Sequence, residues 1–167
     1  PKPGIEGRDA LGAAIPARPG QPYRMSADKS LLVQESRERD AGYQVVVADQ
    51  DGLLVEDSGR LGIRCELTIK GDLDYRFGSL DFIGSVRIRG DVMPGFNITA
   101  QAGIEVEGSV RGGSLVCPGG DIVVKEFVYG GQGSRVISGK SFKAGVAQEI
   151  NAEILGDITI LKEARDS

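Results

Sequence analysis

The sequence predicts an all-β protein built on a right-handed parallel β-helix, a triangular solenoid with about 18 residues per coil. The first observation is that an aliphatic residue recurs at every sixth position. Three steps of six residues would make one coil of three short strands. The second observation is a sequence repeat with a period of eighteen residues, seen in VRIRGDV (86–92), IEVEGSV (104–110) and IVVKEFV (122–128). The residues predicted to form the inward core ladder are Leu80, Val86, Val92, Ile98, Ile104, Val110, Val116, Ile122 and Val128.

The hand of the solenoid needs its own argument, because left-handed β-helices of acyltransferases also use three six-residue sides. Their repeat places Gly, Ala, Glu or Asp directly after the aliphatic residue. Of the eight ladder positions from Val86 to Val128, only Ile104 is followed by one of these residues, Glu105. The sequence therefore favours the right-handed form.

The N-terminal residues, 1–66, are predicted to form a small β-rich cap. Three prolines within 7–22 favour an irregular path at its start. Further on, YQVVVA (43–48) and LLVE (53–56) flank DQDG (49–52), which predicts a hairpin because Asp-Gly tolerates a tight turn. Alternating apolar residues then run from Leu61 to Ile69, so the cap is expected to pass without a break into the first coil and to cover it.

Residues 67–161 are predicted to form the solenoid, with small residues at its corners. YGGQGSR (129–135) is expected to bulge from one corner, after which Val136 and Phe142 re-enter the core. The last residues, 162–167, are charged and helix-compatible, and are interpreted as the start of a truncated tail.

Composition limits the classes of partner. The net charge is −4 with both signs mixed along the chain, and the aromatic residues are four Tyr and five Phe, so no nucleic-acid partner is expected. No apolar run reaches the roughly 18 residues that a membrane span needs.

Catalytic chemistry finds little support in the residues. The chain has no histidine, which excludes Ser-His-Asp triads, Cys-His dyads, histidine metal sites and a hexapeptide acyltransferase. Asp72 and Asp74 could share a cation, but nothing completes a calcium shell, and turn formation is the preferred interpretation. Cys65 and Cys117 are expected to be reduced thiols. We therefore expect no catalytic residue, no metal and no cofactor.

A long central stretch, residues 69–110, carries a run of motif residues: Gly71, Asp72, Asp74, Tyr75, Gly78, Asp81, Phe82, Gly84, Gly90, Asp91, Val92, Gly95, Phe96 and Gly108. Through these residues the stretch resembles the bacterial flagellar assembly protein A (FapA) family. The upstream segment 7–20 also resembles that family's entry segment, and 151–160 its closing coil, while Phe77 stands where the family usually has Thr. The resemblance implies a right-handed β-helix, a cytoplasmic location, no known enzymatic activity, and a role in flagellar assembly or polar organisation. It supplies no catalytic residue and does not identify the protein partner.

A second stretch, 90–113, contains a further set of motif residues: Gly90, Asp91, Val92, Pro94, Gly95, Ala100, Gly103, Ile104, Val106, Gly108, Arg111 and Gly112. Through these residues it is similar to the C-terminal β-helix of the division-site inhibitor MinC. MinC's N-terminal domain bears no likeness to residues 1–66, so a shared architecture with different partners is the sounder inference.

The end of the solenoid is a predicted interface, because an uncovered strand edge is a template for association. Ile154, Ile158 and Ile160 are expected to contact another chain or a downstream element, and a homodimer is preferred. The leading hypothesis is a non-enzymatic cytoplasmic scaffold. The alternatives are a MinC-like or bactofilin-like self-associating β-helix and, more distantly, a carbohydrate-active β-helix enzyme.

Overall fold

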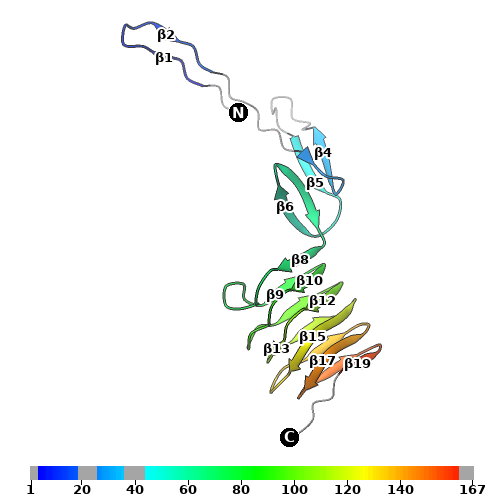
Figure 1. Ribbon diagram of the computed structural model, residues 1–167. Coiled ribbons are helices and arrows are strands. Elements are labelled where there is room, and N and C mark those ends of the chain that lie inside the picture. The colour runs from blue at the N-terminus through cyan, green and yellow to red at the C-terminus, as the bar shows by residue number, and fades with distance from the viewer. Residues whose placement is uncertain (1–3, 19–25, 36–43, 162–167) are drawn as a thin grey trace.

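The computed structural model describes residues 4–18, 26–35 and 44–161, which form nineteen β-strands and no helix (Figure 1). None of these residues lies in a helix long and apolar enough to cross a membrane. The predicted tail, 162–167, lies outside the described residues.

The predicted parallel solenoid is confirmed, and its coils stack one below another from β8 to β19 (Figure 1). Its largest wall, the β8 sheet, pairs strands in the order β19-β17-β15-β12-β10-β8. Their bounds are β8 Glu66–Ile69, β10 Ser85–Ile88, β12 Gly103–Val106, β15 Asp121–Tyr129, β17 Phe142–Gln148 and β19 Ile158–Ile160. Every pairing between them is parallel.

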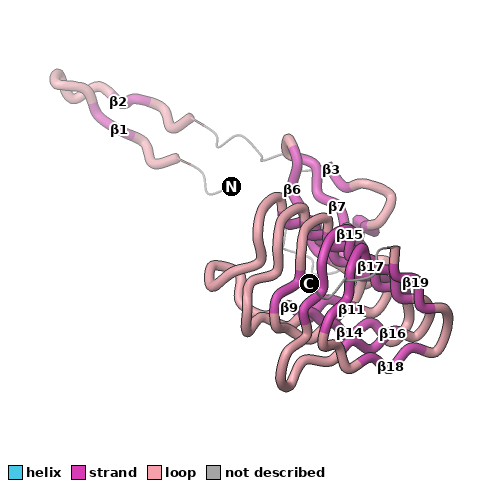
Figure 2. Tube along the Cα trace, turned by 60° about the horizontal axis from the view of Figure 1, so that its bottom comes forward, coloured by secondary structure: helices cyan, strands magenta, loops and turns pink. Residues whose placement is uncertain are grey.

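The second wall, the β9 sheet, has one strand in each of five coils, in the order β18-β16-β14-β11-β9. Its strands are β9 Leu80–Phe82, β11 Ile98–Ala100, β14 Leu115–Cys117, β16 Val136–Ser138 and β18 Ala152–Ile154. Figure 2 looks along the stack and shows β15, β17 and β19 on one side with β14, β16 and β18 on the other.

A third, narrow wall completes the triangle. Isolated parallel bridges join Leu73 to Val92 and Val92 to Val110, and β13 (Val110–Arg111) then pairs with the far end of β15, which pairs with the far end of β17. We call this the Val92 wall. Because β15 and β17 each contribute to two walls, the last coils turn this corner without leaving the strand.

The core runs through the centre of the prism as columns of stacked aliphatic side chains. Val86, Val92, Ile98, Ile104, Val110, Ile122 and Val128 are all at most 2% exposed, and Leu80 packs against this core while half-buried. Each buried Val or Ile contributes roughly 1.5–3 kcal/mol.

The predicted ladder is wrong at Val116, which is half-exposed, whereas its neighbours Leu115 and Cys117 are fully buried. Ile98 pairs with Leu115, and Val116 pairs with the outward Thr99. The corner through Gly112 and Gly113 is one residue shorter than the eighteen-residue repeat requires. Because side chains alternate along a strand, this one-residue change moves Val116 to the outer surface.

The fourth coil is longer than its neighbours, as predicted. Val128 ends the inward column of its coil, and Val136 and Phe142 re-enter the core at 2% and 0% exposure. The extra residues lie in the loop 130–135, between β15 and β16. A register shift between Val124 and Phe127 adds a bulge in the middle of β15.

The N-terminal strands form three small sheets. β1 (Gly7–Arg8) pairs with β2 (Ala14–Ile15), β4 (Leu31–Glu35) with β5 (Gln44–Ala48), and β7 (Arg60–Arg64) with both β3 (Ser26–Ala27) and β6 (Leu53–Asp57). The hairpin predicted across DQDG is therefore wrong, because β5 and β6 belong to different sheets. The tight hairpin turn is Ser58-Gly59, both at positive φ (52° and 78°), which suits a two-residue turn between β6 and β7.

The junction with the solenoid also differs from the prediction. β7 ends at Arg64 and β8 begins at Glu66, with a bend at Cys65, whose side chain is exposed. Among the described strands β8 pairs only with β10, so the N-terminal sheets add no strand to the first coil.

Candidate interaction surfaces

The family-motif residues build a corner at which each coil caps the next. Asp72 Oδ1 accepts a hydrogen bond from the Asp91 N–H at 2.8 Å, and Asp91 Oδ1 accepts one from the Ser109 N–H at 2.8 Å. Ser109 Oγ continues the ladder by donating to Glu126 Oε2 at 3.2 Å. These side chains satisfy backbone donors that turn away from the strand ladder at the corner.

Glycine is required at two positions beside this ladder, because a carboxylate of the preceding coil occupies the space that a Cβ atom would need. A Cβ atom at Gly90 would come within 2.1 Å of Asp72 Oδ1, and one at Gly108 within 2.2 Å of Asp91 Oδ1. The recurring Gly-Asp pair is therefore one structural unit that joins two coils, and its role here is structural.

Asp74 organises the loop that follows the first corner. Its Oδ1 accepts from the Arg76 N–H at 2.9 Å, its Oδ2 lies 2.9 Å from Arg76 Nη2, and its carbonyl accepts from the N–H groups of Phe77 and Gly78. The hydrogen bond from the Arg76 guanidinium, followed by that from its N–H, lowers the pKa of Asp74. This turn fixes the loop and presents Tyr75, which is 84% exposed.

The remaining motif residues serve the fold. Phe82 and Phe96 pack against the core, Gly84 is buried, and Gly78 and Gly95 have positive φ in successive loops. Asp81 lies on the outer side of β9, opposite Thr99.

A second capping ladder was not predicted from the sequence. At the corner leading into the β9 sheet, Ser79 Oγ accepts from the Asn97 N–H, Asn97 Oδ1 from the Ser114 N–H, and Ser114 Oγ from the Arg135 N–H. The signal is present as small polar residues at nearly the coil spacing, but residues of this kind also occur in ordinary turns.

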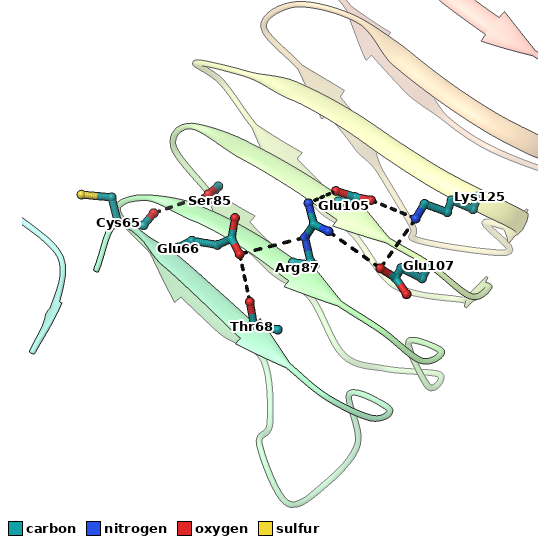
Figure 3. A network of polar contacts seen from close by, with 8 residues as sticks. All are labelled: Cys65, Glu66, Thr68, Ser85, Arg87, Glu105, Glu107 and Lys125. Carbon is teal, nitrogen blue, oxygen red and sulfur yellow. Dashed lines mark hydrogen bonds and ion pairs between the residues drawn. The ribbon is translucent and has the colours of Figure 1, made fainter. Parts of the chain in front are cut away.

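A charged network covers the outer face of the β8 sheet (Figure 3). Arg87 Nη2 lies 2.7 Å from Glu105 Oε2, and Lys125 Nζ lies 3.1 Å from Glu105 Oε1 and 3.6 Å from Glu107 Oε1. Glu66 lies at the first-coil end of this network, 4.0 Å from Arg87 Nε. Exposed ion pairs of this kind stabilise a protein by about 0–1 kcal/mol each. The network therefore adds little to stability, and its cross-strand pairs of opposite charge favour the observed strand register.

A shallow depression of about 260 Å³ lies beside this network, where Gly103 leaves the wall without a side chain. Ser85, Asp121 and Val123 contribute to its lining. Asp121 is already engaged, because its Oδ1 accepts hydrogen bonds from the N–H and the hydroxyl of Ser141. No group of three or more His, Cys, Asp or Glu in the described parts of the chain could hold a metal ion.

Both cysteines are free, and they differ in environment. Burial in the core raises the pKa of Cys117 because it disfavours the thiolate, so this thiol is unreactive. Cys65 is exposed, and its thiol donates to the Asp51 carbonyl at 3.6 Å.

The predicted interface residues lie in the last coil. β19 ends the β8 sheet and β18 ends the β9 sheet. Ile158 and Ile160 pair with the buried Phe142 and Ala144, yet they are 57% and 39% exposed. Ile154 is half-buried, so the inward columns reach this end of the solenoid without a covering layer among the described residues.

Comparison with known proteins agrees with this architecture. A family model described as the Flagellar Assembly Protein A beta solenoid domain matches residues 66–167, more than half of the chain, starting at the first residue of β8. Neither a curated protein nor a solved structure matches the chain. The match and the described parallel coils both begin at Glu66, and the chain belongs to the FapA β-solenoid family.

Proposed function

We propose that this protein is a non-enzymatic scaffold that binds other proteins in the cytoplasm, in flagellar assembly or polar organisation. The family's description supports the link with flagellar assembly. The geometry of the described residues supports a scaffold, because the polar side chains described above form hydrogen bonds between coils and ion pairs on the surface, and do not gather around a common site.

The observation that carries this proposal is the open last coil. Ile158 and Ile160 occupy inward columns whose members in the preceding coils are buried, and both remain exposed. The backbone of β19 also has a strand neighbour on one side only, within the described residues. An apolar coil end with a free strand edge is a surface built for another strand or chain.

A second copy of the chain is the occupant we favour. Closed two-fold symmetry is the commonest arrangement of homo-oligomers, and β19 presents only Ile158, Thr159 and Ile160, so an antiparallel copy meets no like charge in these positions. The dimer would seal both coil ends at once.

Sedimentation velocity over a range of concentrations tests this proposal. Ile158→Glu should convert a dimer into a monomer, because it places a carboxylate in the buried contact. Val123→Glu is the matched control, since Val123 is on the outer side of the same wall, and it should remain dimeric. A wild-type chain that is monomeric at all concentrations would overturn the self-association.

The same measurement distinguishes the proposed dimer from the alternative, a MinC-like or bactofilin-like polymer. β8 is the other terminal strand of its sheet within the described part, so a head-to-tail contact would join β19 to β8 of the next copy. That contact does not close, and it would give an open series of species instead of one dimer.

A further inference from the structure

The exposed apolar side chains of the solenoid gather at one corner. Within residues 66–150 the large apolar side chains that are exposed are Tyr75, Phe77, Ile83, Met93 and Tyr129. Four of these five lie where the Val92 wall turns toward the β9 sheet, and Ile83 lies at a different corner, after β9. Scattered exposure is normal, whereas clustering on one edge is not.

Backbone pairing places these residues on successive coils. Met93 N–H donates to the Leu73 carbonyl, Arg111 N–H donates to the Val92 carbonyl, and Arg111 pairs with Tyr129. Met93, Arg111 and Tyr129 therefore form one outward column, with neighbours about 4.8 Å apart. Arg135 lies nearby, one coil beyond Ser114, at the corner that leads into the β9 sheet.

The charges at this corner leave two arginines available. Arg76 is engaged by Asp74, but the Arg111 side chain is 63% exposed and approaches Asp91 only at 4.0 Å. Arg135 is exposed and makes no ion pair with any described residue. Tyr129 donates its hydroxyl hydrogen bond to Glu149 Oε2 at 3.0 Å, which holds the ring in place.

The loop at the upper end of the corner is preorganised. It projects from the side of the solenoid between β8 and β9 (Figure 1). Besides the turn at Asp74, the Arg76 guanidinium lies 5.9 Å from the centroid of the Phe77 ring. Aromatic residues held in a fixed loop lose little conformational entropy on binding.

We infer that this corner, formed by Tyr75, Phe77, Met93, Arg111, Tyr129 and Arg135, is a docking edge for an acidic segment of a protein partner, lying along the solenoid axis. Tyr, Phe, Met and Arg are the residues enriched at the centres of protein interfaces. The exposed guanidinium groups of Arg111 and Arg135 favour carboxylates in the partner, and the rings beside them favour apolar side chains in the same segment. This inference rests on the proposed scaffold function and names one partner class for it.

Site-specific photo-cross-linking in the cells that produce the protein tests the docking edge. A photoreactive phenylalanine derivative replaces Tyr75 or Tyr129, and the same group at Ile83 is the control at another corner. We expect both corner positions to cross-link to one segment rich in Asp and Glu, and Ile83 to give no such product. Cross-links to RNA, or to a segment without carboxylates, would overturn the inference.

A peptide synthesised from the cross-linked segment then gives the quantitative test. Arg111→Glu and Arg135→Glu should each weaken its binding about tenfold or more, with a loss of affinity at high salt. Lys143→Glu, the same charge change on the β8 sheet, should bind like the wild type. Equal weakening by all three would contradict a localised edge.

The outcomes also separate this inference from the scaffold function. Partner cross-links confined to other positions would overturn the docking edge and leave the scaffold intact. No protein cross-link at any position would count against both.

Discussion

The Oδ1 atom of Asp72 accepts a hydrogen bond from the backbone N–H of Asp91, 2.8 Å away in the next coil. This contact joins two turns of the solenoid through a side chain where strand pairing is interrupted. It also explains why glycine precedes Asp91 and Ser109, since the carboxylate of one coil occupies the space that a Cβ would fill in the next.

Gly90→Ala is therefore expected to destabilise the protein. The added methyl group would lie 2.1 Å from Asp72 Oδ1 and 2.8 Å from backbone atoms of the first coil. Overpacking of this kind costs about 1–3 kcal/mol, measured by urea unfolding. Gly103→Ala is the matched control, because its nearest contact would be 3.8 Å, and it should be neutral or slightly stabilising. Equal losses would show that the corner is not tightly packed.

The corrected register predicts opposite effects for adjacent residues. Leu115→Asp buries an unpaired carboxylate and should cost several kcal/mol, enough to unfold a marginally stable domain. Val116→Asp places the same group on the outer surface and should change the unfolding free energy by less than about 1 kcal/mol. Thermal melts of the two variants compare these effects directly, and the reverse order would restore the six-residue ladder at Val116.

Acid should weaken the last coils through Asp121. Two hydrogen bonds from Ser141, the hydroxyl first and the N–H second, lower the pKa of Asp121 below its ordinary value of 3.8. A carboxyl whose pKa is lower in the folded state than in the unfolded state stabilises the protein when the pH is above the unfolded-state pKa. This stabilisation is lost as the pH falls through the folded-state pKa. Ser141→Ala should therefore reduce the stability difference between pH 6 and pH 3, measured by urea unfolding at each pH. An unchanged difference would mean that this contact does not persist in solution.

Much of the solenoid is predictable from the sequence because most inward positions carry an aliphatic side chain in successive coils. Val86, Ile104 and Ile122 repeat at eighteen residues for that reason, and they pair in register. Leu115, Val116 and Cys117 could not be sorted in the same way, since all three are apolar. Their orientation depends on the length of the preceding corner, which no local pattern reveals.

Contacts between coils explain what else was missed. The carboxylate of Asp72 was expected to form a turn, but its hydrogen-bond donor, the N–H of Asp91, belongs to the following coil. The hairpin predicted across DQDG was wrong because the turn sequence alone does not decide which strand pairs with β5. An Asp-Gly sequence permits a tight turn, but β5 pairs with β4, the strand before it, and not with β6.

The exposed ion pairs of the β8 sheet should contribute little to stability. Lys125→Ala removes two contacts, to Glu105 and Glu107, from a side chain that is 51% exposed. We expect a loss of no more than about 1 kcal/mol, shrinking further in high salt. A larger loss that does not depend on salt would show that these ion pairs contribute more to the free energy of unfolding than their exposure indicates.

Amide hydrogen exchange as a function of protein concentration tests most directly the claim that the last coil is a contact surface. The amides of β19, Ile158–Ile160, should become protected as the concentration rises, because a second copy covers the free edge. The amides of β12, Gly103–Val106, lie between two paired strands and should exchange slowly at every concentration. Exchange of the β19 amides at one unchanged rate over the whole range would contradict the claim.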